Sequence, residues 1–366
     1  FSNRYAFRPA AATAGLLVGG YHGPAFTQTS SAEPPIVLEA LSVYGEVDSS
    51  AQKAARLKAD APNAIEVIDG EQLHQFNEQA LGDALRRVPG ITFDGANRAR
   101  EIRLRGLPGE YTQVLINGRP MIDGESRRNF EVDRIPTGLV ERVEVIRTPR
   151  ASQQGQGGAG TVNIVLKSGA QVAPQQLSIG GGYLDGIGEQ GELTIFQTGN
   201  LGAMEVALGL SAQRFQRSES KDSLNFDASG AAAGGELGTN ERRFDQFNLM
   251  PRFGLQSQDS GRFEFDPFYM RTKEFRDDIS IDLAADQVTH GRRTVEDRER
   301  VRESYGFHTN WQGGIGSSAS VRAGLDWQRG KTDTARDETR FNTNGSINRT
   351  RQRSERIDLA LTRPEV

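Results

Sequence analysis

A glycine-rich segment of the chain has the spacing of a loop that can hold a phosphate group. The letters GQGGAG, at Gly155–Gly160, match the G-x-G-x-x-G pattern of dinucleotide-binding loops. Such a loop needs a strand directly before it and a helix directly after it, because the helix N-terminus holds the pyrophosphate. Here Pro149–Gln154 separates the glycines from the preceding strand-like segment, and Thr161–Leu166 is itself strand-like. We therefore interpret the glycines as a tight loop.

Residues suited to metal binding or covalent catalysis are sparse. The chain has no cysteine, which excludes disulfides, thiolate metal sites and thiol nucleophiles. The four histidines follow no ligand spacing, and no nucleophile is paired in the sequence with a recognisable base. These histidines are His22, His74, His290 and His308. The sequence therefore predicts a protein that is not an enzyme, with no cofactor and no bound metal.

The charge of the chain gives no reason to expect a nucleic-acid partner. Its 366 residues carry a formal net charge of −4, so no global basic field is present. The basic run at Arg336–Arg356 is interleaved with acidic residues. We predict that this run forms a solvated external loop.

Residues 64–172 have the pattern of a compact α+β domain. Alternation over Ala64–Ile68 predicts a strand, and Asp69 is placed to cap a short helix after it. The segment Ala80–Val88 has its apolar residues on one helical face, and Pro89-Gly90 ends it. A hairpin turn is predicted at Asn117-Gly118. Further strands are predicted at 101–106, 113–116, 140–146 and 161–166.

Beyond residue 172, helical periodicity gives way to long alternating strands. We predict eight, near 176–184, 189–199, 203–216, 242–256, 262–275, 299–311, 318–330 and 350–361. Short turns alternate with long polar loops, which are expected at 217–241, 276–298 and 331–349. Long strands joined in this way are typical of an outer-membrane β-barrel, whereas a soluble β-sandwich usually has shorter strands. The predicted fold is an α+β domain followed by antiparallel transmembrane β-barrel strands of an incomplete barrel.

The first 63 residues precede these two regions. Residues 1–32 have the order of an export signal: Arg4 and Arg8, an apolar run at Ala10–Gly20, and small residues ending at Ala32. A tail without regular structure is the alternative. Residues 33–63 lack a long periodic segment, so we predict an extended linker with one short strand-like island.

Four motifs follow one another in a fixed order between residues 39 and 164. They are EALSVYG at 39–45, ALGDALRRVPG at 80–90, IRLRG at 102–106 with VLING at 114–118, and VERVEVIRTP at 140–149 with GAGTVNI at 158–164. Together they resemble the TonB-dependent receptor family. Two departures concern loop geometry. The chain has Arg147-Thr148-Pro149 where the family usually has Arg-Gly-Pro, and a Gln-Gly run at 153–158 where a Tyr-Gly pair is common.

The resemblance implies a plug domain at 64–172 and a barrel of about 22 strands, of which 173–366 would supply the first eight or so. It implies a bacterial outer-membrane location, contact with lipid, and energised uptake of a scarce, bulky ligand, by default a ferric siderophore. The first motif would be a TonB box, which adds as a strand to the periplasmic TonB protein. Its residues are Glu39, Ala40, Leu41, Ser42, Val43, Tyr44 and Gly45.

The resemblance also assigns roles within the plug. Arg105 and Arg147 match arginines that hold the plug to glutamates of the barrel wall, although solvated strand arginines are the alternative. The upper plug loops would contact the ligand, with solvated side chains as the alternative. The candidates are Asp94, Asn97, Arg98, Arg119, Met121, Asp123, Arg127 and Arg128.

Two other functions are alternatives to transport. A receptor that also signals to transcription would need a further domain before the TonB box, and Glu33–Leu38 leaves no room for one. A truncated or non-transporting β-rich outer-membrane binding protein is the other alternative. An unclosed sheet would leave unpaired backbone groups in lipid, so closure would require strands beyond Val366.

Overall fold

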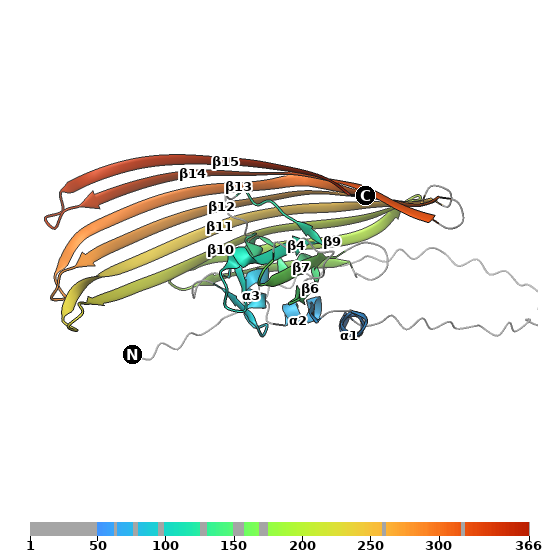
Figure 1. Ribbon diagram of the computed structural model, residues 1–366. Helices are drawn as coiled ribbons and strands as arrows, with labels where there is room; N and C mark the ends of the chain where they lie inside the picture. Colours follow the sequence, from blue (N-terminus) through green and yellow to red (C-terminus); the bar gives the residue numbers. More distant parts are fainter. Residues whose placement is uncertain are drawn as a thin grey trace, which may run out of the picture. The chain divides into compact units, whose positions relative to one another are not determined.

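The computed structural model describes residues 50–61, 64–75, 80–93, 99–124, 130–148, 157–167, 175–257, 261–315 and 319–365. The predicted export signal and TonB box lie outside the described residues. The described chain forms a small α+β domain and a sheet of long strands, seen together in Figure 1.

The α+β domain is built on a five-stranded sheet with the order β1-β6-β7-β4-β5. Strands β4 and β7 are parallel, and the other pairs are antiparallel. The strands are β1 (Ile65–Asp69), β4 (Thr112–Ile116), β5 (Arg119–Pro120), β6 (Val140–Ile146) and β7 (Gly160–Leu166). A separate antiparallel pair consists of β2 (Ile91–Phe93) and β3 (Ile102–Leu104).

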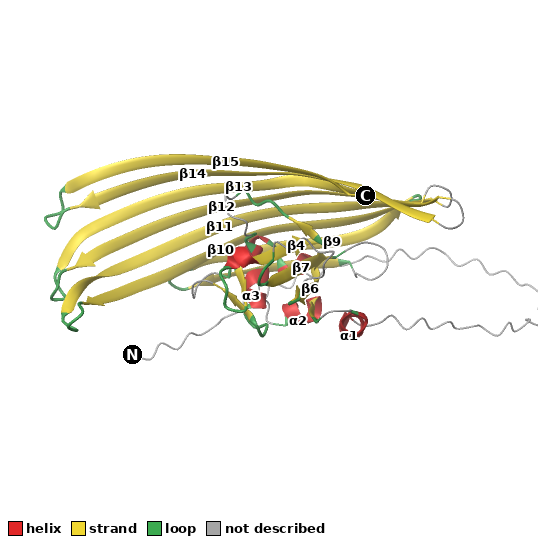
Figure 2. Cartoon of the chain, in the orientation of Figure 1, coloured by secondary structure: helices red, strands yellow, loops and turns green. Residues whose placement is uncertain are grey.

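Short helices precede and connect these strands (Figure 2). They are α1 (Ser50–Asp60), α2 (Gly70–His74), α3 (Leu81–Leu85) and the 3-10 turns η1 (Gly109–Tyr111), η2 (Val132–Arg134) and η3 (Thr137–Leu139). Within the described ranges, none of the helices has the length and apolar character needed to span a membrane.

Local sequence signals account for two features of this domain. Asp69 caps α2, because its carboxylate accepts a hydrogen bond from the backbone N–H of Gln72 at 2.9 Å. Asn117 and Gly118 both have positive φ, at 50° and 80°, as a two-residue hairpin turn requires. Both confirm the predictions made from the sequence.

Two helices differ from the sequence predictions. Helix α1 lies in the segment predicted to be an extended linker. Of its described side chains only Ala54 is buried, so helix-favouring alanines and lysines form it without an apolar stripe. Helix α3 is shorter than the predicted 80–88, because the chain turns after Leu85 toward Pro89.

The core of the α+β domain extends onto the long sheet. It packs α3, η2 and the strands of the small sheet together, with Leu81, Val132 and Val143 fully buried. Met270 of the long sheet belongs to the same cluster and is fully buried as well. Each such side chain contributes roughly 1.5–3 kcal/mol on burial. Apolar packing therefore joins the two regions.

The long sheet has eight antiparallel strands, each paired with its neighbours in sequence. They are β8 (Gln176–Leu184), β9 (Gly188–Leu201), β10 (Met204–Phe226), β11 (Ala232–Ser257), β12 (Gly261–Leu283), β13 (His290–Ile315), β14 (Ala319–Phe341) and β15 (Ile347–Glu365). All eight predicted strands are present. The predicted long loops are wrong, because residues 217–226, 276–283 and 331–341 continue the strands and only 227–231, 284–289 and 342–346 connect them.

The two faces of the sheet explain why the strands continue into the segments predicted to be loops. On the outward face, aromatic side chains stack across strands, as in Phe253–Phe265 and Phe307–Trp327. This apolar band ends near Tyr269 and Tyr305, and charged residues occupy both faces beyond it. Strand pairing depends on backbone hydrogen bonds, which continue where the apolar alternation stops. The alternating pattern in the sequence therefore ends with the apolar band, although the strands themselves extend beyond it.

A close backbone approach joins the loop after β5 of the α+β domain to β14. A Cβ built on Gly124 would lie 2.8 Å from the carbonyl carbon of Lys331, and Gly124 has φ +81°. Gly118 has nearly the same φ, +80°, with nothing within 4 Å of a Cβ. A side chain at either position would therefore be strained by the backbone, but only at Gly124 would it also meet a neighbouring strand.

We predict that Gly124→Ala destabilises the protein more than Gly118→Ala. Both substitutions cost about 1–2 kcal/mol for the left-handed backbone, and Gly124→Ala adds about 1–3 kcal/mol for the steric contact. The measurement is the denaturation midpoint of the complete protein in detergent, with protease protection of the α+β domain. Equal midpoints for the two variants would contradict the close approach.

Candidate functional site

A buried arginine fastens the α+β domain to the inner face of the long sheet. Arg134, in η2, has no exposed surface. Its Nε donates to the hydroxyl of Thr272 at 3.3 Å, and its Nη1 donates to the hydroxyl of Ser304 at 3.3 Å. The same Nη1 lies 3.2 Å from the carbonyl oxygen of Asp123, which accepts from it. One side chain therefore joins the domain to β12 and β13.

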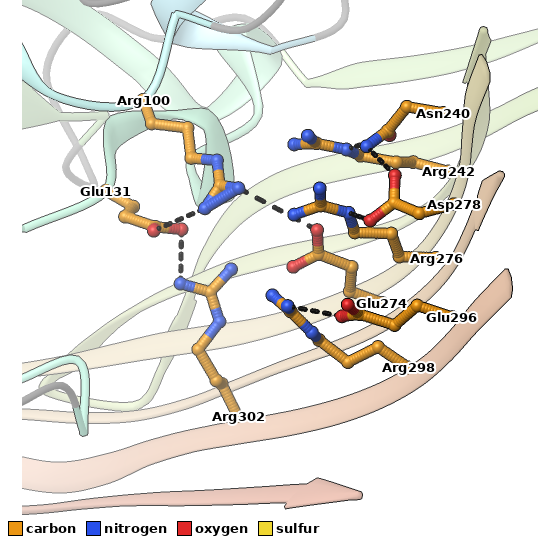
Figure 3. Close-up of polar contacts among 10 residues, drawn as sticks. All are labelled: Arg100, Glu131, Asn240, Arg242, Glu274, Arg276, Asp278, Glu296, Arg298 and Arg302. Carbon is orange, nitrogen blue, oxygen red and sulfur yellow. Dashed lines mark hydrogen bonds and ion pairs between the residues drawn. The ribbon is translucent and has the colours of Figure 1, made fainter. Parts of the chain in front are cut away.

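A chain of ion pairs runs beside Arg134 (Figure 3). Arg302 of β13, also fully buried, pairs with Glu131. Glu131 pairs in turn with Arg100, at 3.0 Å, and Arg100 lies 3.8 Å from the carboxylate of Glu274 on β12. Charges from the domain and from the sheet thus alternate in sign, which offsets the cost of removing them from water.

The pKa values of the domain arginines reflect this environment. Burial, followed by the nearby charge of Arg302, lowers the pKa of Arg134 to about 10. Burial also acts to lower the pKa of Arg100, but the carboxylates of Glu131, Glu274 and Asp133 outweigh it and the pKa is raised. Both guanidinium groups therefore remain charged at neutral pH.

Further polar contacts surround the cluster. Gln246 of β11 donates to the carbonyl oxygen of Asp133 at 3.1 Å. Gln328 of β14 accepts from the backbone N–H of Ile122 at 3.1 Å and donates to the carbonyl oxygen of Pro120 at 3.0 Å. The inner face of the sheet therefore contacts the domain through hydrogen bonds to its backbone groups as well as through the side-chain pairs of the cluster.

An open pocket lies between the end of the small sheet and strands β11–β14. It holds about 650 Å³ of empty space, part of which is open solvent. Arg252 and Asp266 form a bidentate pair on its wall, with both N–O distances at 2.8 Å. Lys167 also lines the pocket, and burial lowers the pKa of its amine. The pocket offers mixed polar and apolar surface to a ligand.

Residues 57–162 match the family described as the TonB-dependent Receptor Plug Domain. The chain belongs to the TonB-dependent receptor family. Its α+β region is the plug domain, and its location is the bacterial outer membrane. Among the described residues of this receptor, no group of three or more His, Cys, Asp or Glu could hold a metal ion.

Curated relatives are receptors and transporters. The receptor is 32% identical over 124 residues to the iron-regulated outer membrane virulence protein of Vibrio cholerae, covering 32% of this chain and 19% of that protein. It is 28% identical over 139 residues to the ferrienterobactin receptor of Escherichia coli, covering 34% of this chain and 19% of that one. The matched segments thus span about a fifth of the length of these relatives.

Solved structures of receptors also resemble the chain. The ferric citrate transporter FecA in its unliganded form is similar with a TM-score of 0.44 and 15% identity, over 83% of this chain and 53% of that chain.

Arg105 and Arg147 of the receptor contact each other and other parts of the plug. Arg105 donates to the carbonyl oxygen of Arg147 at 2.7 Å. Arg147 pairs with Glu66 of β1 at 2.8 Å and donates to the carbonyl oxygen of Pro89 at 3.3 Å. These contacts brace the plug internally, and the role of both arginines in pairing with the barrel wall stays a prediction.

The predicted ligand residues have different surroundings. Arg119 and Met121 line the pocket. Asp123 is buried, and its carboxylate accepts from the backbone N–H of Glu131 at 3.3 Å, which ties the loop to η2. Their contact with a ligand stays a prediction. The remaining candidates lie outside the described residues: Asp94, Asn97, Arg98, Arg127 and Arg128.

Sequence reasoning missed the charged cluster. Asp133-Arg134 looks like an ordinary polar pair in a loop, and Arg302 alternates with apolar residues as a solvated strand arginine would. The one available signal was the polar content of the sheet face opposite the apolar band, on which Arg302 lies. Nothing in the sequence indicates which plug residue meets it.

We predict that Arg302→Met lowers the free energy of unfolding by about 3–5 kcal/mol, because it leaves Glu131 buried with one cation fewer. The measurement is the chemical denaturation midpoint of the complete receptor in detergent.

The double variant Glu131→Gln/Arg302→Met serves as the control. It removes both charges of the pair, so we expect it to recover part of the loss. If the loss of stability in the double variant equals the sum of the losses in Arg302→Met and Glu131→Gln, the two residues do not pair directly.

Proposed function

We propose that this receptor carries out energised uptake of a scarce, bulky ligand across the outer membrane. The observation that carries the proposal is a plug domain seated by buried charges on the polar inner face of a sheet whose outer face is apolar. A plug that occupies the lumen stops free diffusion. Uptake therefore requires the plug to move, and a polar interface is one that can separate and become solvated.

The outer face of the sheet supports a place in lipid. Aromatic side chains of β11–β14 form a continuous series there, in which Phe265, Phe307 and Trp327 lie with ring centroids 5.8 Å apart in successive pairs. The polar residues Gln246, Thr272 and Ser304 lie buried on the opposite face. Apolar-out and polar-in alternation is the pattern of a transmembrane barrel wall.

Energy would reach the plug through the periplasm. The segment Glu39–Gly45 is proposed to act as the TonB box, pairing by main-chain hydrogen bonds with an exposed strand of the TonB protein. The ligand is proposed to be a metal chelate, by default a ferric siderophore. Support comes from the names of the relatives, which include a ferrienterobactin receptor and an iron-regulated outer membrane protein.

We predict that Val43→Pro in the complete receptor abolishes energised uptake of its ferric chelate and leaves binding of that chelate intact. Proline removes one backbone donor from the added strand. Val43→Ala is the matched control and should keep uptake, since it retains the backbone N–H. The measurement is accumulation of ⁵⁵Fe by whole cells alongside binding to energy-depleted cells.

The second candidate function is a non-transporting outer-membrane binding protein. It shares the plug and the apolar outer band but needs no coupling to the periplasm. Uptake equal to that of the wild type by the Val43→Pro variant would remove the TonB box from the mechanism. Binding without any energy-dependent accumulation by the wild type would favour the non-transporting function.

A further inference from the structure

Six arginines lie directly opposite one another across six neighbouring strands. The register of the long sheet pairs Arg217 with Arg242, and each following strand adds one arginine at the same level. The row consists of Arg217, Arg242, Arg276, Arg298, Arg336 and Arg353, on β10 to β15 in order. We call these six residues the arginine row.

The arginine row lies on the plug-facing side of the sheet. Arg276 is four residues from Thr272, and Arg298 is four residues from Arg302, so each pair shares a face. Thr272 and Arg302 contact the plug directly. Figure 3 shows side chains of the row on the same side as Arg100 and Glu131 of the plug. At one end of the row, Arg217 pairs with Asp83 of α3.

A row of like charges at this spacing is unfavourable by itself, because side chains directly opposite in a sheet repel when they carry the same sign. Carboxylates of the adjacent row reduce the repulsion. Arg276 pairs with Asp278 at 2.5 Å, and Arg298 pairs with Glu296 at 2.7 Å. Arg336 contacts Glu296 as well. Each of these carboxylates lies two residues from an arginine of the row on the same face.

The compensation is incomplete. The arginine row and the two rows beyond it hold ten cationic side chains and four carboxylates. The added cations are Lys221, Arg340, Arg349 and Arg351, and the carboxylates are Glu219, Asp278, Glu296 and Glu338. Arg276, Arg298 and Arg336 keep 25%, 21% and 33% of their side chains exposed. The guanidinium groups of the row are therefore partly accessible, and the surface around them has a net positive charge.

We propose that the arginine row is a binding surface for a multiply charged anion, specifically a metal chelate that presents several carboxylates. This inference rests on the proposed function and names the substrate class for it. Guanidinium groups bind carboxylates through paired, charge-assisted hydrogen bonds, and neighbouring strands place successive groups about 5 Å apart. A compact polycarboxylate can thus bridge two or three arginines at once.

Aromatic side chains border the row on the plug side. Phe215 and Phe244 stack with centroids 4.7 Å apart, and the guanidinium of Arg217 lies 5.6 Å above the ring of Phe215. This contact, together with the pair with Asp83, holds Arg217 at the β10 end of the row. The row is therefore tied to α3 of the plug at its β10 end.

The test compares two double variants of the complete receptor purified in detergent. Arg276→Gln/Arg298→Gln removes two charges from the row. Arg271→Gln/Arg293→Gln removes two from the opposite face of the same strands and is the matched control. Binding of radiolabelled ferric citrate is measured by equilibrium dialysis, with uncharged cyanocobalamin as the comparison probe.

We expect the wild type and the control variant to bind ferric citrate in preference to cyanocobalamin. The row variant should bind ferric citrate on the order of 10–100 times more weakly. Rising salt should weaken binding by the wild type, since exposed ion pairs are screened. The proposal is overturned if the wild type does not bind ferric citrate, if both double variants lose affinity equally, or if the row variant binds as the wild type does.

Binding in detergent needs no energised transport, so this result separates from the uptake experiment. Binding that depends on the row without uptake would sink the proposed function and leave the anion site standing. Uptake that depends on Val43, in a receptor with no affinity for ferric citrate, would support the proposed function and overturn the anion site.

Discussion

The pairing of buried charges between the plug and the sheet is the interaction on which the rest of this receptor depends. A sheet with an apolar outer face must direct its polar residues inward, so the plug meets hydroxyls, amides and Arg302. Arg134 and Glu131 supply the complementary groups. Because buried ion pairs gain little net stability over apolar contacts, such an interface specifies the position of the plug while keeping its release accessible.

The same inward polarity continues along the strands beyond the apolar band. Close to the plug, Arg302 is matched by the carboxylate of Glu131. Farther along, the arginine row has fewer carboxylates than cations beside it. One inner face thus serves two purposes: paired charges hold the plug, and the net positive charge of the arginine row would attract an anion. Strands β12 and β13 carry both groups, with Thr272 and Arg302 at the plug and Arg276 and Arg298 in the row.

Sequence patterns predicted the elements better than their ends. The eight long strands were found from alternation, and the α2 cap at Asp69 and the turn at Asn117-Gly118 from residue chemistry. The predicted loops failed because polar residues on both faces removed the alternation while the backbone ladder continued. Helix α1 escaped notice because helix propensity without an apolar stripe leaves no periodic signal.

What the sequence by itself determined was local or carried by motifs: the α+β plug, the family, the strands and the hairpin turn. These features depend on residues that are close together in the sequence, so their spacing along the chain is enough to predict them. The charged cluster and the arginine row were decided only by tertiary structure. Arg134 meets Ser304 across 170 positions, and the row exists only because five strand pairings have one particular register. A shift of one residue in any pairing would turn an arginine to the opposite face, and no pattern within a single strand encodes that alignment.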